Sequence, residues 1–399
     1  MSFYLSSPPD FEAHNAEVQA VWEAYHAGRP HRVPVSIGGS IRNFLQNPEF
    51  NDTGYTFQDF FEDPEAQIQC QLRYQKWLRY HLVCDREMGP PAEGWAVAVD
   101  FQNSVDASWF GCPLYYQGNH VPDTREILKD EPRRLYDLEC PDPLGSGLVG
   151  RAVEFYEYMQ ERCRQLEFEG LPVLPPHGIP GEGSDGALDA AYKLRGAAQV
   201  CVDLAADPDY FHDLLGYLTE CLIRRMKAVR EWRWERQPEA PDRGQFRRPG
   251  YAWADDAIVL LSPAQYREHV LPYHRRFVEE FSDGGPTAVH LCGDAQRFFP
   301  LLREELNVQS FDTGFPVDFA RLRSELGPGV QISGGPTIML VKSGPPEAIR
   351  AEVRRICASG LMAGGKFILI AANNLSPLTP LEHTNALYEA GKEFGRYVD

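Results

Sequence analysis

From residue 253 onward, short apolar segments alternate with longer amphipathic segments, and this alternation limits the possible folds more than any other feature. The predicted strands are 253–260, 287–294, 308–311, 330–333 and 367–371, and the predicted helices 263–281, 295–306, 318–326, 345–359 and 382–397 lie between and after them. Strands separated by helices of this length form a mostly parallel sheet. Because each strand ends in a polar residue or glycine, we expect a closed (β/α)8 barrel, with a doubly wound sheet as the alternative.

The first half of the chain has the same character but is less regular. Predicted strands cover 32–37, 95–101 and 171–174, and predicted helices cover 13–27, 63–83, 153–168, 187–202 and 208–234. Proline, glycine and aromatic residues crowd residues 104–150, which we interpret as an elaborated insertion. We therefore predict an α/β protein with one domain over residues 1–399, a TIM barrel with an elaborated N-terminal and loop region.

Composition excludes several classes of function. The net charge is −18, and no run of lysine and arginine offsets it, so we expect neither nucleic acid nor an anionic membrane as a partner. No apolar run approaches the roughly 20 residues of a membrane span, and residues 1–12 have no apolar signal core. The nine cysteines are scattered without a C-x-x-C pair, which is typical of a reducing compartment, so we predict a cytoplasmic protein.

The strand at 287–294 carries the most distinctive pair of side chains. Its sequence, Thr-Ala-Val-His-Leu-Cys-Gly-Asp, places His290 and Cys292 on the same face, because side chains alternate along a strand. An imidazole beside a thiol can bind zinc, can act as a base and its nucleophile, or can simply pack in a core. A position at a strand end, followed by Gly-Asp, favours a functional role.

Polar residues at the other strand ends add to this pair. In a barrel, functional groups lie at the carboxyl ends of the strands. The predicted catalytic residues are Asp255, Asp256 and Asp312, and the predicted substrate-binding residues are Asp100, Asn103, Asn373 and Asn374. Asp255 and Asp256 could form an acid/base pair or a capping cluster. The glycine-rich segment 178–186 lacks the setting of a dinucleotide site, and we interpret it as a loop over the barrel mouth.

Several motifs of the C-terminal half occur together in a known order. They are Ala254-Asp255-Asp256 with the following Leu-Ser-Pro-Ala-Gln-Tyr, His290-Leu291-Cys292-Gly293, Gly334-Gly335-Pro336, and the Leu-Ser-Pro-Leu-Thr-Pro-Leu-Glu run at 375–382. In these motifs, over about residues 185 to 395, the chain resembles the uroporphyrinogen decarboxylase superfamily. That superfamily includes the decarboxylases and the corrinoid-linked methyltransferases.

The resemblance implies a (β/α)8 barrel with its site at the mouth. The His-x-Cys-Gly motif is similar to the zinc motif of the methyltransferase branch, which implies a metal, zinc, on His290 and Cys292. In that branch zinc activates a thiol, whose thiolate attacks a methyl group carried on cobalt. The chain contains no Asp-x-His-x-x-Gly corrinoid motif, so the corrinoid (cobalamin) would be supplied by a separate partner protein.

Two departures from the superfamily pattern matter. The methyltransferase branch has a further Cys ligand just before the Pro-x-Thr-Pro element, and Asn373 stands there in this chain. A neutral amide is a poor zinc ligand. The decarboxylase branch has an arginine-rich N-terminal signature, which this chain lacks although Arg32 and Arg42 flank the first strand.

We therefore predict an enzyme that transfers a methyl group between a small methylated substrate or thiol and a corrinoid protein, with its metal held by His290 and Cys292. The alternative is a metal-free decarboxylase or lyase of the same superfamily, acting on a small or tetrapyrrole-type carboxylate with His290 as its acid/base. A third hypothesis is a binding subunit without activity. It is weaker, because many polar groups converge on one rim.

Overall fold

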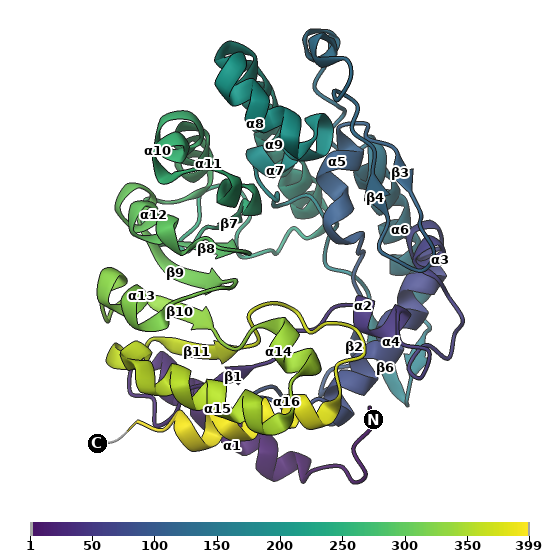
Figure 1. Ribbon diagram of the computed structural model, residues 1–399. Helices are drawn as coiled ribbons and strands as arrows, with labels where there is room; N and C mark the ends of the chain where they lie inside the picture. Colours follow the sequence, from purple (N-terminus) through teal and green to yellow (C-terminus); the bar gives the residue numbers. More distant parts are fainter. Residues whose placement is uncertain (1–2, 398–399) are drawn as a thin grey trace.

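The computed structural model describes residues 3–397, so residues 1, 2, 398 and 399, the ends of the predicted domain, lie outside the described chain. A six-stranded sheet has the order β1-β11-β10-β9-β8-β7, and all of its pairings are parallel. Its strands are Val35–Ser36 (β1), Ala252–Ala254 (β7), Thr287–Leu291 (β8), Val308–Thr313 (β9), Gln331–Gly334 (β10) and Phe367–Ile370 (β11). Strands β7 to β11 point the same way, toward the middle of the molecule (Figure 1).

A second group of strands completes the barrel. β2 (Trp95–Ala96) pairs in parallel with β6 (Leu171–Leu174), and β5 (Glu167–Phe168) forms an antiparallel hairpin with β6. β2 and β6 bring the number of parallel strands to the eight that a (β/α)8 barrel requires. Within residues 3–397, no strand pairing joins β1 to β2 or β6 to β7, so the wall consists of two hydrogen-bonded arcs. The predicted α/β barrel is confirmed.

Helices cover the outside of the strands, as Figure 1 shows for α11, α12 and α13 beside β7 to β10. The longer helices are Phe11–His26 (α1), Pro64–His81 (α4), Gly147–Cys163 (α6), Ala187–Arg195 (α7), Ala197–Ala206 (α8), Pro208–Arg236 (α9), Leu271–Phe281 (α11), Phe299–Leu306 (α12), Phe319–Leu326 (α13), Pro346–Ile356 (α15) and Leu381–Phe394 (α16). The shorter ones are Arg42–Leu45 (α2), Phe57–Glu62 (α3), Val105–Trp109 (α5), Pro263–Gln265 (α10) and Ile338–Ser343 (α14).

Several elements differ from the prediction. The strand predicted at 253–260 ends at Ala254, and a 3-10 helix follows over Asp256–Leu260. The helix predicted at 187–202 is divided at Gly196, whose φ of 91° a helix cannot accommodate. Helix α14 was not predicted, because it is short and follows a proline.

The strand predicted at 95–101 stops at Ala96, and α4 explains why. Three glutamines at helical spacing on α4, Gln67, Gln71 and Gln75, bond the backbone of residues 96–100 in place of a neighbouring strand. Gln71 both accepts from the Ala98 amide at 2.9 Å and donates to the Ala98 carbonyl at 2.7 Å. The backbone is therefore satisfied by side chains, and no sheet ladder forms there.

The insertion at 104–150 packs against helix α9. It contains α5, a hairpin of β3 (Leu114–Tyr115) with β4 (Asp123–Thr124), and a 3-10 helix at Pro132–Asp137. Tyr217 of α9 donates to the Glu139 carbonyl at 2.9 Å, and the buried Arg225 of α9 pairs with Asp106 at 2.6 Å. This segment is thus attached to the barrel by a buried ion pair and an exposed hydrogen bond.

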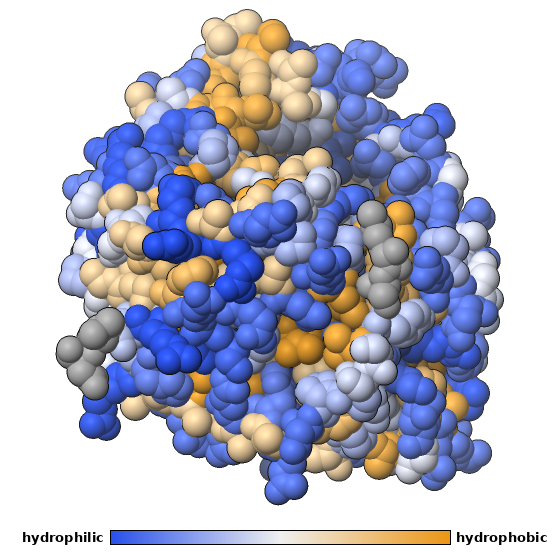
Figure 2. Space-filling view, turned by 60° about the horizontal axis from the view of Figure 1, so that its bottom comes forward, coloured by the Kyte–Doolittle hydropathy of each residue, from blue (hydrophilic) through white to orange (hydrophobic). Residues whose placement is uncertain are grey.

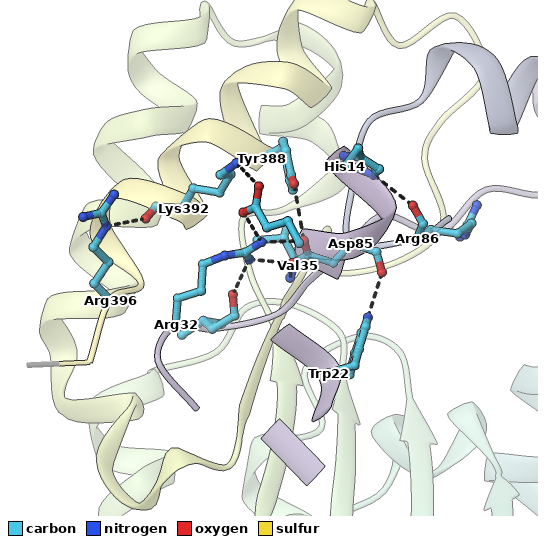
Figure 3. Close-up of polar contacts among 11 residues, drawn as sticks. His14, Trp22, Arg32, Val35, Asp85, Arg86, Tyr388, Lys392 and Arg396 are labelled. Carbon is cyan, nitrogen blue, oxygen red and sulfur yellow. Dashed lines mark hydrogen bonds and ion pairs between the residues drawn. The ribbon is translucent and has the colours of Figure 1, made fainter. Parts of the chain in front are cut away.

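A buried polar network ties the first strand to the two ends of the chain (Figure 3). Asp85, whose side chain is fully buried, accepts from both terminal nitrogens of Arg32 at 2.6 and 2.7 Å and from the Val35 amide at 2.6 Å. Trp22 of α1 donates to the Asp85 carbonyl at 2.8 Å, and the Tyr388 hydroxyl of α16 lies 3.4 Å from the carboxylate. Asp85, through its carboxylate and its backbone carbonyl, therefore connects β1, α1 and α16.

The face on the side of α1 and α16 is covered mainly by hydrophilic side chains, with small hydrophobic patches among them (Figure 2). Three of the large exposed hydrophobic residues lie in segments that follow strands: Leu260 after β7, Met339 after β10 and Leu378 after β11. Across residues 3–397, every helix is too short or too polar to cross a membrane.

Candidate functional site

The pairing of β8 with β9 places His290 beside Asp312. The two residues are register partners in parallel strands, and the His290 Nδ1 atom lies 2.8 Å from a carboxylate oxygen of Asp312. Cys292 follows the end of β8, and its Sγ atom lies 3.2 Å from the other ring nitrogen of His290, Nε2. Asp312 accepts a hydrogen bond from Nδ1–H and so orients the ring with Nε2 toward the sulfur.

The pairing of β7 with β8 brings Asp256 to the same place. Ala254 is the register partner of His290, so Asp256 and Cys292, each two residues further on, lie side by side. The Cys292 amide donates to Asp256 Oδ1 at 2.7 Å. One donor atom each from Asp256, His290 and Cys292 lie within 4.8 Å of one another, and such a group of oxygen, nitrogen and sulfur donors can hold a metal ion.

Asn373 reaches this group from the far side of β9 and β10. It follows β11, and its Nδ2 atom donates to Cys292 Sγ at 3.0 Å. Its Oδ1 atom accepts from the Asn374 amide at 2.7 Å, which fixes the orientation of the side-chain amide. The hydrogen-bond donor of Asn373, rather than its oxygen, therefore faces the thiol.

A cavity of about 600 Å³ opens beside these residues at the carboxyl ends of the strands. Six of the predicted site residues line it: Asn103, Asp256, His290, Cys292, Asn373 and Asn374. Eight polar residues that were not predicted line it as well: Ser40, Arg42, Gln102, Asp106, Asp185, Asp189, Lys193 and Ser376. The cavity is large enough for a small organic substrate.

Three predicted site residues stand behind the cavity wall. Asp312 reaches the site through His290. Asp100 accepts from the Gln102 amide at 2.8 Å and from its side chain at 2.6 Å, and Gln102 in turn accepts from Arg42 Nε at 3.1 Å. Asp100 therefore positions a cavity residue rather than facing the cavity itself.

Asp255 is the third, and it is fully buried. Its carboxylate accepts from the amides of Leu188 and Asp189, at 3.0 and 3.1 Å, at the start of α7. A side chain at Gly186 (φ 104°) would meet this carboxylate at 2.4 Å, so only glycine allows the approach. Of the two interpretations of the Asp255-Asp256 pair, the structure assigns capping to Asp255 and a cavity position to Asp256.

Electrostatic interactions change the pKa of several groups in the site. Hydrogen bonds with Asp312 and then Cys292 raise the pKa of His290 to about 10, so without a metal this imidazole holds a proton at neutral pH. Burial, together with the carboxylates of Asp255 and Asp256, raises the pKa of Asp189 to about 8. The cavity wall therefore contains groups that can hold a proton at neutral pH.

The unpredicted cavity residues come from segments that sequence patterns describe poorly. Asp106 belongs to the insertion, where Arg225 contacts it, and Asp185 lies in the glycine-rich segment, which Glu182 ties to Arg233. Arg42 follows β1 and lies largely inside the wall, and its Nε donates to Gln102. Within residues 3–397, its terminal nitrogens make no hydrogen bond or ion pair. Only two features of the sequence indicated these residues: the position of Arg42 after a strand, and the Ser-Asp-Gly sequence at 184–186 in the glycine-rich segment.

His274 contacts Asp255 behind the cavity wall, and it makes the stability of the folded state depend on pH. Its Nε2 atom lies 3.1 Å from Asp255, its Nδ1 atom lies 2.8 Å from the Tyr266 hydroxyl, and burial lowers its pKa to about 3. The unfolded chain binds this proton near pH 6.5 and the folded chain only near pH 3, so the stability of the folded state falls as the pH decreases through this range.

We therefore expect wild type to lose stability relative to His274→Gln at up to about 1.4 kcal/mol per pH unit on acidification from about pH 6 to pH 4. Urea unfolding at several pH values measures this difference. Parallel stability curves for the two proteins would contradict the prediction.

Known proteins are similar to this chain in sequence and in fold. Residues 250–394 match the family model for uroporphyrinogen decarboxylase (URO-D). The chain is 34% identical to a methylated-thiol–coenzyme M methyltransferase of Methanosarcina mazei, over 84% of this chain and 81% of the relative. The chain belongs to the uroporphyrinogen decarboxylase superfamily.

Other members of the superfamily are similar over much of the chain. A uroporphyrinogen decarboxylase of Gluconacetobacter diazotrophicus is 28% identical over 68% of both proteins. The solved structure of a methyltransferase from Methanosarcina mazei covers 94% of this chain and 98% of its own, with a TM-score of 0.60 and 18% identity. At that identity the structural match supports the superfamily fold alone.

Proposed function

We propose that this superfamily member transfers a methyl group between a small methylated substrate or thiol and a corrinoid protein, using a metal held by His290 and Cys292. The observation that carries the proposal is the grouping of an imidazole, a thiol and a carboxylate within 4.8 Å of one another at the wall of the cavity. The 34% identical methyltransferase relative supports it.

The residues present fit zinc. The donor set of nitrogen, sulfur and oxygen is the one zinc prefers, and Asp312 on Nδ1 leaves Nε2 free to bind, as carboxylates do behind metal-bound histidines. When bound, zinc would lower the pKa of a substrate thiol so that the thiolate predominates at neutral pH. His290 and Cys292 would hold the ion, and the cavity would orient the substrate.

In the methyl transfer itself, the substrate sulfur supplies the electron pair. The thiolate attacks the methyl group carried by the corrinoid, the new sulfur–carbon bond forms, and the electron pair of the broken bond stays on cobalt. In the reverse direction the same residues would activate a methylated donor. Asp185 lines the same cavity, and burial, followed by the charges of nearby carboxylates, raises its pKa to about 7. Asp185 could take up the proton that the thiol releases, whereas Asp189, with a pKa of about 8, already holds a proton at neutral pH.

The exposed residues Leu260, Met339 and Leu378 support docking of the corrinoid protein at this end of the barrel. Met339 and Leu378 are the chain neighbours of Ile338 and Pro377, which line the cavity. Exposed large hydrophobic side chains around a site entrance are typical of a protein–protein contact. Asn103 and Asn374 would contact the substrate from the opposite wall and the C-terminal loop.

Arg42 points to an anionic group on the substrate. Its guanidinium lines the cavity with its terminal nitrogens unpaired among residues 3–397, and a carboxylate or sulfonate is the group that such a fork binds best.

We expect Arg42→Gln to raise the KM for an acidic thiol by about 10- to 100-fold, the loss of one charged hydrogen-bonded contact, with little change in kcat. An uncharged thiol of the same length serves as the control, because its KM should not change. Equal effects on both thiols would contradict the assignment.

One observation favours a second function. The paired His290 and Asp312, with the pKa of His290 at about 10, form a proton donor at the cavity wall that a metal-free decarboxylase or lyase could use. Such an enzyme would retain activity after metal chelation.

The decisive experiment combines the chain with free methylcobalamin and a small acidic thiol, and follows loss of the methyl–cobalt absorption with and without zinc. Methyl transfer that requires zinc supports the proposed function. Absence of transfer to every thiol tested, together with release of carbon dioxide from a carboxylate substrate, would favour the decarboxylase.

A further inference from the structure

We infer that Asp256 is the third metal ligand of this chain, and that Asn373 does not bind the metal but hydrogen-bonds the Cys292 sulfur. This inference rests on the metal centre of the proposed function and specifies its ligands. The methyltransferase branch that the chain resembles has a cysteine at the position of Asn373, so this chain would bind its metal through nitrogen, sulfur and oxygen with only one thiolate.

The orientation of Asn373 excludes its oxygen as a ligand. Oδ1 accepts from the Asn374 amide at 2.7 Å, and Nδ2 donates to Cys292 Sγ at 3.0 Å. An amide nitrogen has no lone pair available for a metal. Turning the amide would break both hydrogen bonds and bring two acceptors, the oxygen and the sulfur, together.

The orientation of Asp256 favours its carboxylate as the ligand. Oδ1 accepts from the Cys292 amide at 2.7 Å, which fixes the carboxylate next to the sulfur. Within residues 3–397, the second oxygen accepts no hydrogen bond. The Asp256 amide donates to Asp189 Oδ2 at 3.0 Å, so the backbone of Asp256 is held as well.

Asp312 is the other candidate carboxylate, and it is placed differently. It lies 2.8 Å from Nδ1, on the side of the imidazole away from the sulfur, where it orients the ring. Asp312 therefore orients the imidazole from the side away from the sulfur, whereas the Asp256 carboxylate lies next to the sulfur.

The ligand assignment has a chemical consequence. A hydrogen bond from Asn373 withdraws electron density from the single thiolate, and a carboxylate is a harder donor than a second thiolate. The bound ion would be a stronger Lewis acid than in a site with two thiolates, and it would be less selective for soft metals such as cadmium.

The test measures metal binding alone, on metal-free full-length protein. Zinc affinity is determined by competition with a chelator for wild type, Asp256→Asn, Asp312→Asn and Asp294→Asn. Asp294 is the matched control, because it is an exposed carboxylate just beyond Cys292. We expect a loss of at least about 100-fold for Asp256→Asn and about 10-fold for Asp312→Asn, the range for residues that hold a ligand, and none for Asp294→Asn.

Cobalt provides a second readout, since each thiolate bound to Co²⁺ adds a charge-transfer band in the near ultraviolet. We expect the band of Asn373→Cys to be about twice as intense as that of wild type, and its zinc affinity to rise, because a second thiolate joins the site. Asn373→Ala should keep the single-thiolate intensity. Circular dichroism checks that each variant is folded.

Three results would overturn the inference: zinc affinity of Asp256→Asn equal to that of the Asp294→Asn control, an unchanged cobalt band in Asn373→Cys, or a wild type that binds neither metal. The proposed function is tested separately by methyl transfer. A wild type that binds zinc through Asp256 but transfers no methyl group would support the inference and refute the proposed function. If the wild type transfers methyl groups and Asp256→Asn binds zinc as tightly as wild type, the proposed function is supported and the inference is refuted.

Discussion

Replacing Cys292 by alanine is expected to abolish both metal binding and methyl transfer. The sulfur is the only thiol among the donors that lie within 4.8 Å of one another, and three side chains, including His290 and Asn373, converge on this residue. Without it, Asp256 and His290 remain, and two ligands are too few for a stable zinc site. We expect kcat/KM to fall at least about a thousandfold, which corresponds to about 4 kcal/mol of lost transition-state stabilisation.

Metal content by elemental mass spectrometry and methyl transfer to a thiol measure this outcome together. His290→Ala should behave in the same way, while Cys201→Ala, a partly buried thiol on α8, should retain both properties. Loss of activity with full metal content would show that Cys292 acts as a nucleophile. Release of carbon dioxide from a carboxylate substrate that persists in Cys292→Ala and is lost in His290→Ala would favour the metal-free lyase.

Strand periodicity predicted the two adjacent strands that position His290, Cys292 and Asp256, although the first of them ends at Ala254 rather than at Leu260. It left Asp255, Asp256 and Asp312 as alternative partners of His290 and Cys292. His290, Cys292 and Asp256 follow from two adjacent parallel strands in register, and local sequence encodes both strands. The same reasoning located Asn373 after the last strand. Short apolar strands between helices carry a strong local signal, and the rim position follows from the parallel arrangement.

Apart from Asn103, the residues of the opposite wall could not be predicted, because the structure of this wall depends on contacts distant in sequence. Gln67, Gln71 and Gln75 replace a strand partner for residues 96–100, and no local pattern announces such a substitution. Asp106 faces the cavity because Arg225, more than a hundred residues away in the sequence, holds it there. The different positions of Asp255 and Asp256 likewise depend on Gly186. Because this residue has no side chain, the Asp255 carboxylate can reach the start of α7.

Replacing Asp85 by asparagine is expected to destabilise the fold strongly without altering the site. The carboxylate is fully buried, and it holds Arg32 through two hydrogen bonds and the β1 backbone through a third. Asparagine keeps the shape but removes the charge, so the buried guanidinium is left with only the partly exposed Glu17 as an ionic partner. Breaking a buried ion pair in this way costs about 3–5 kcal/mol of the free energy of unfolding.

Urea unfolding followed by circular dichroism measures this loss, and Asp52→Asn is the control. Asp52 pairs with Arg73 at 3.0 Å on the surface, with 70% of its side chain exposed, so its removal should cost less than about 1 kcal/mol. Zinc affinity of folded Asp85→Asn should equal that of wild type, because the network lies outside the set of residues that line the cavity. Equal losses of stability in the two variants would contradict the role assigned to the network. Weakened zinc binding in the folded Asp85→Asn protein would mean that the packing of β1 against α1 and α16 also determines the geometry of the site.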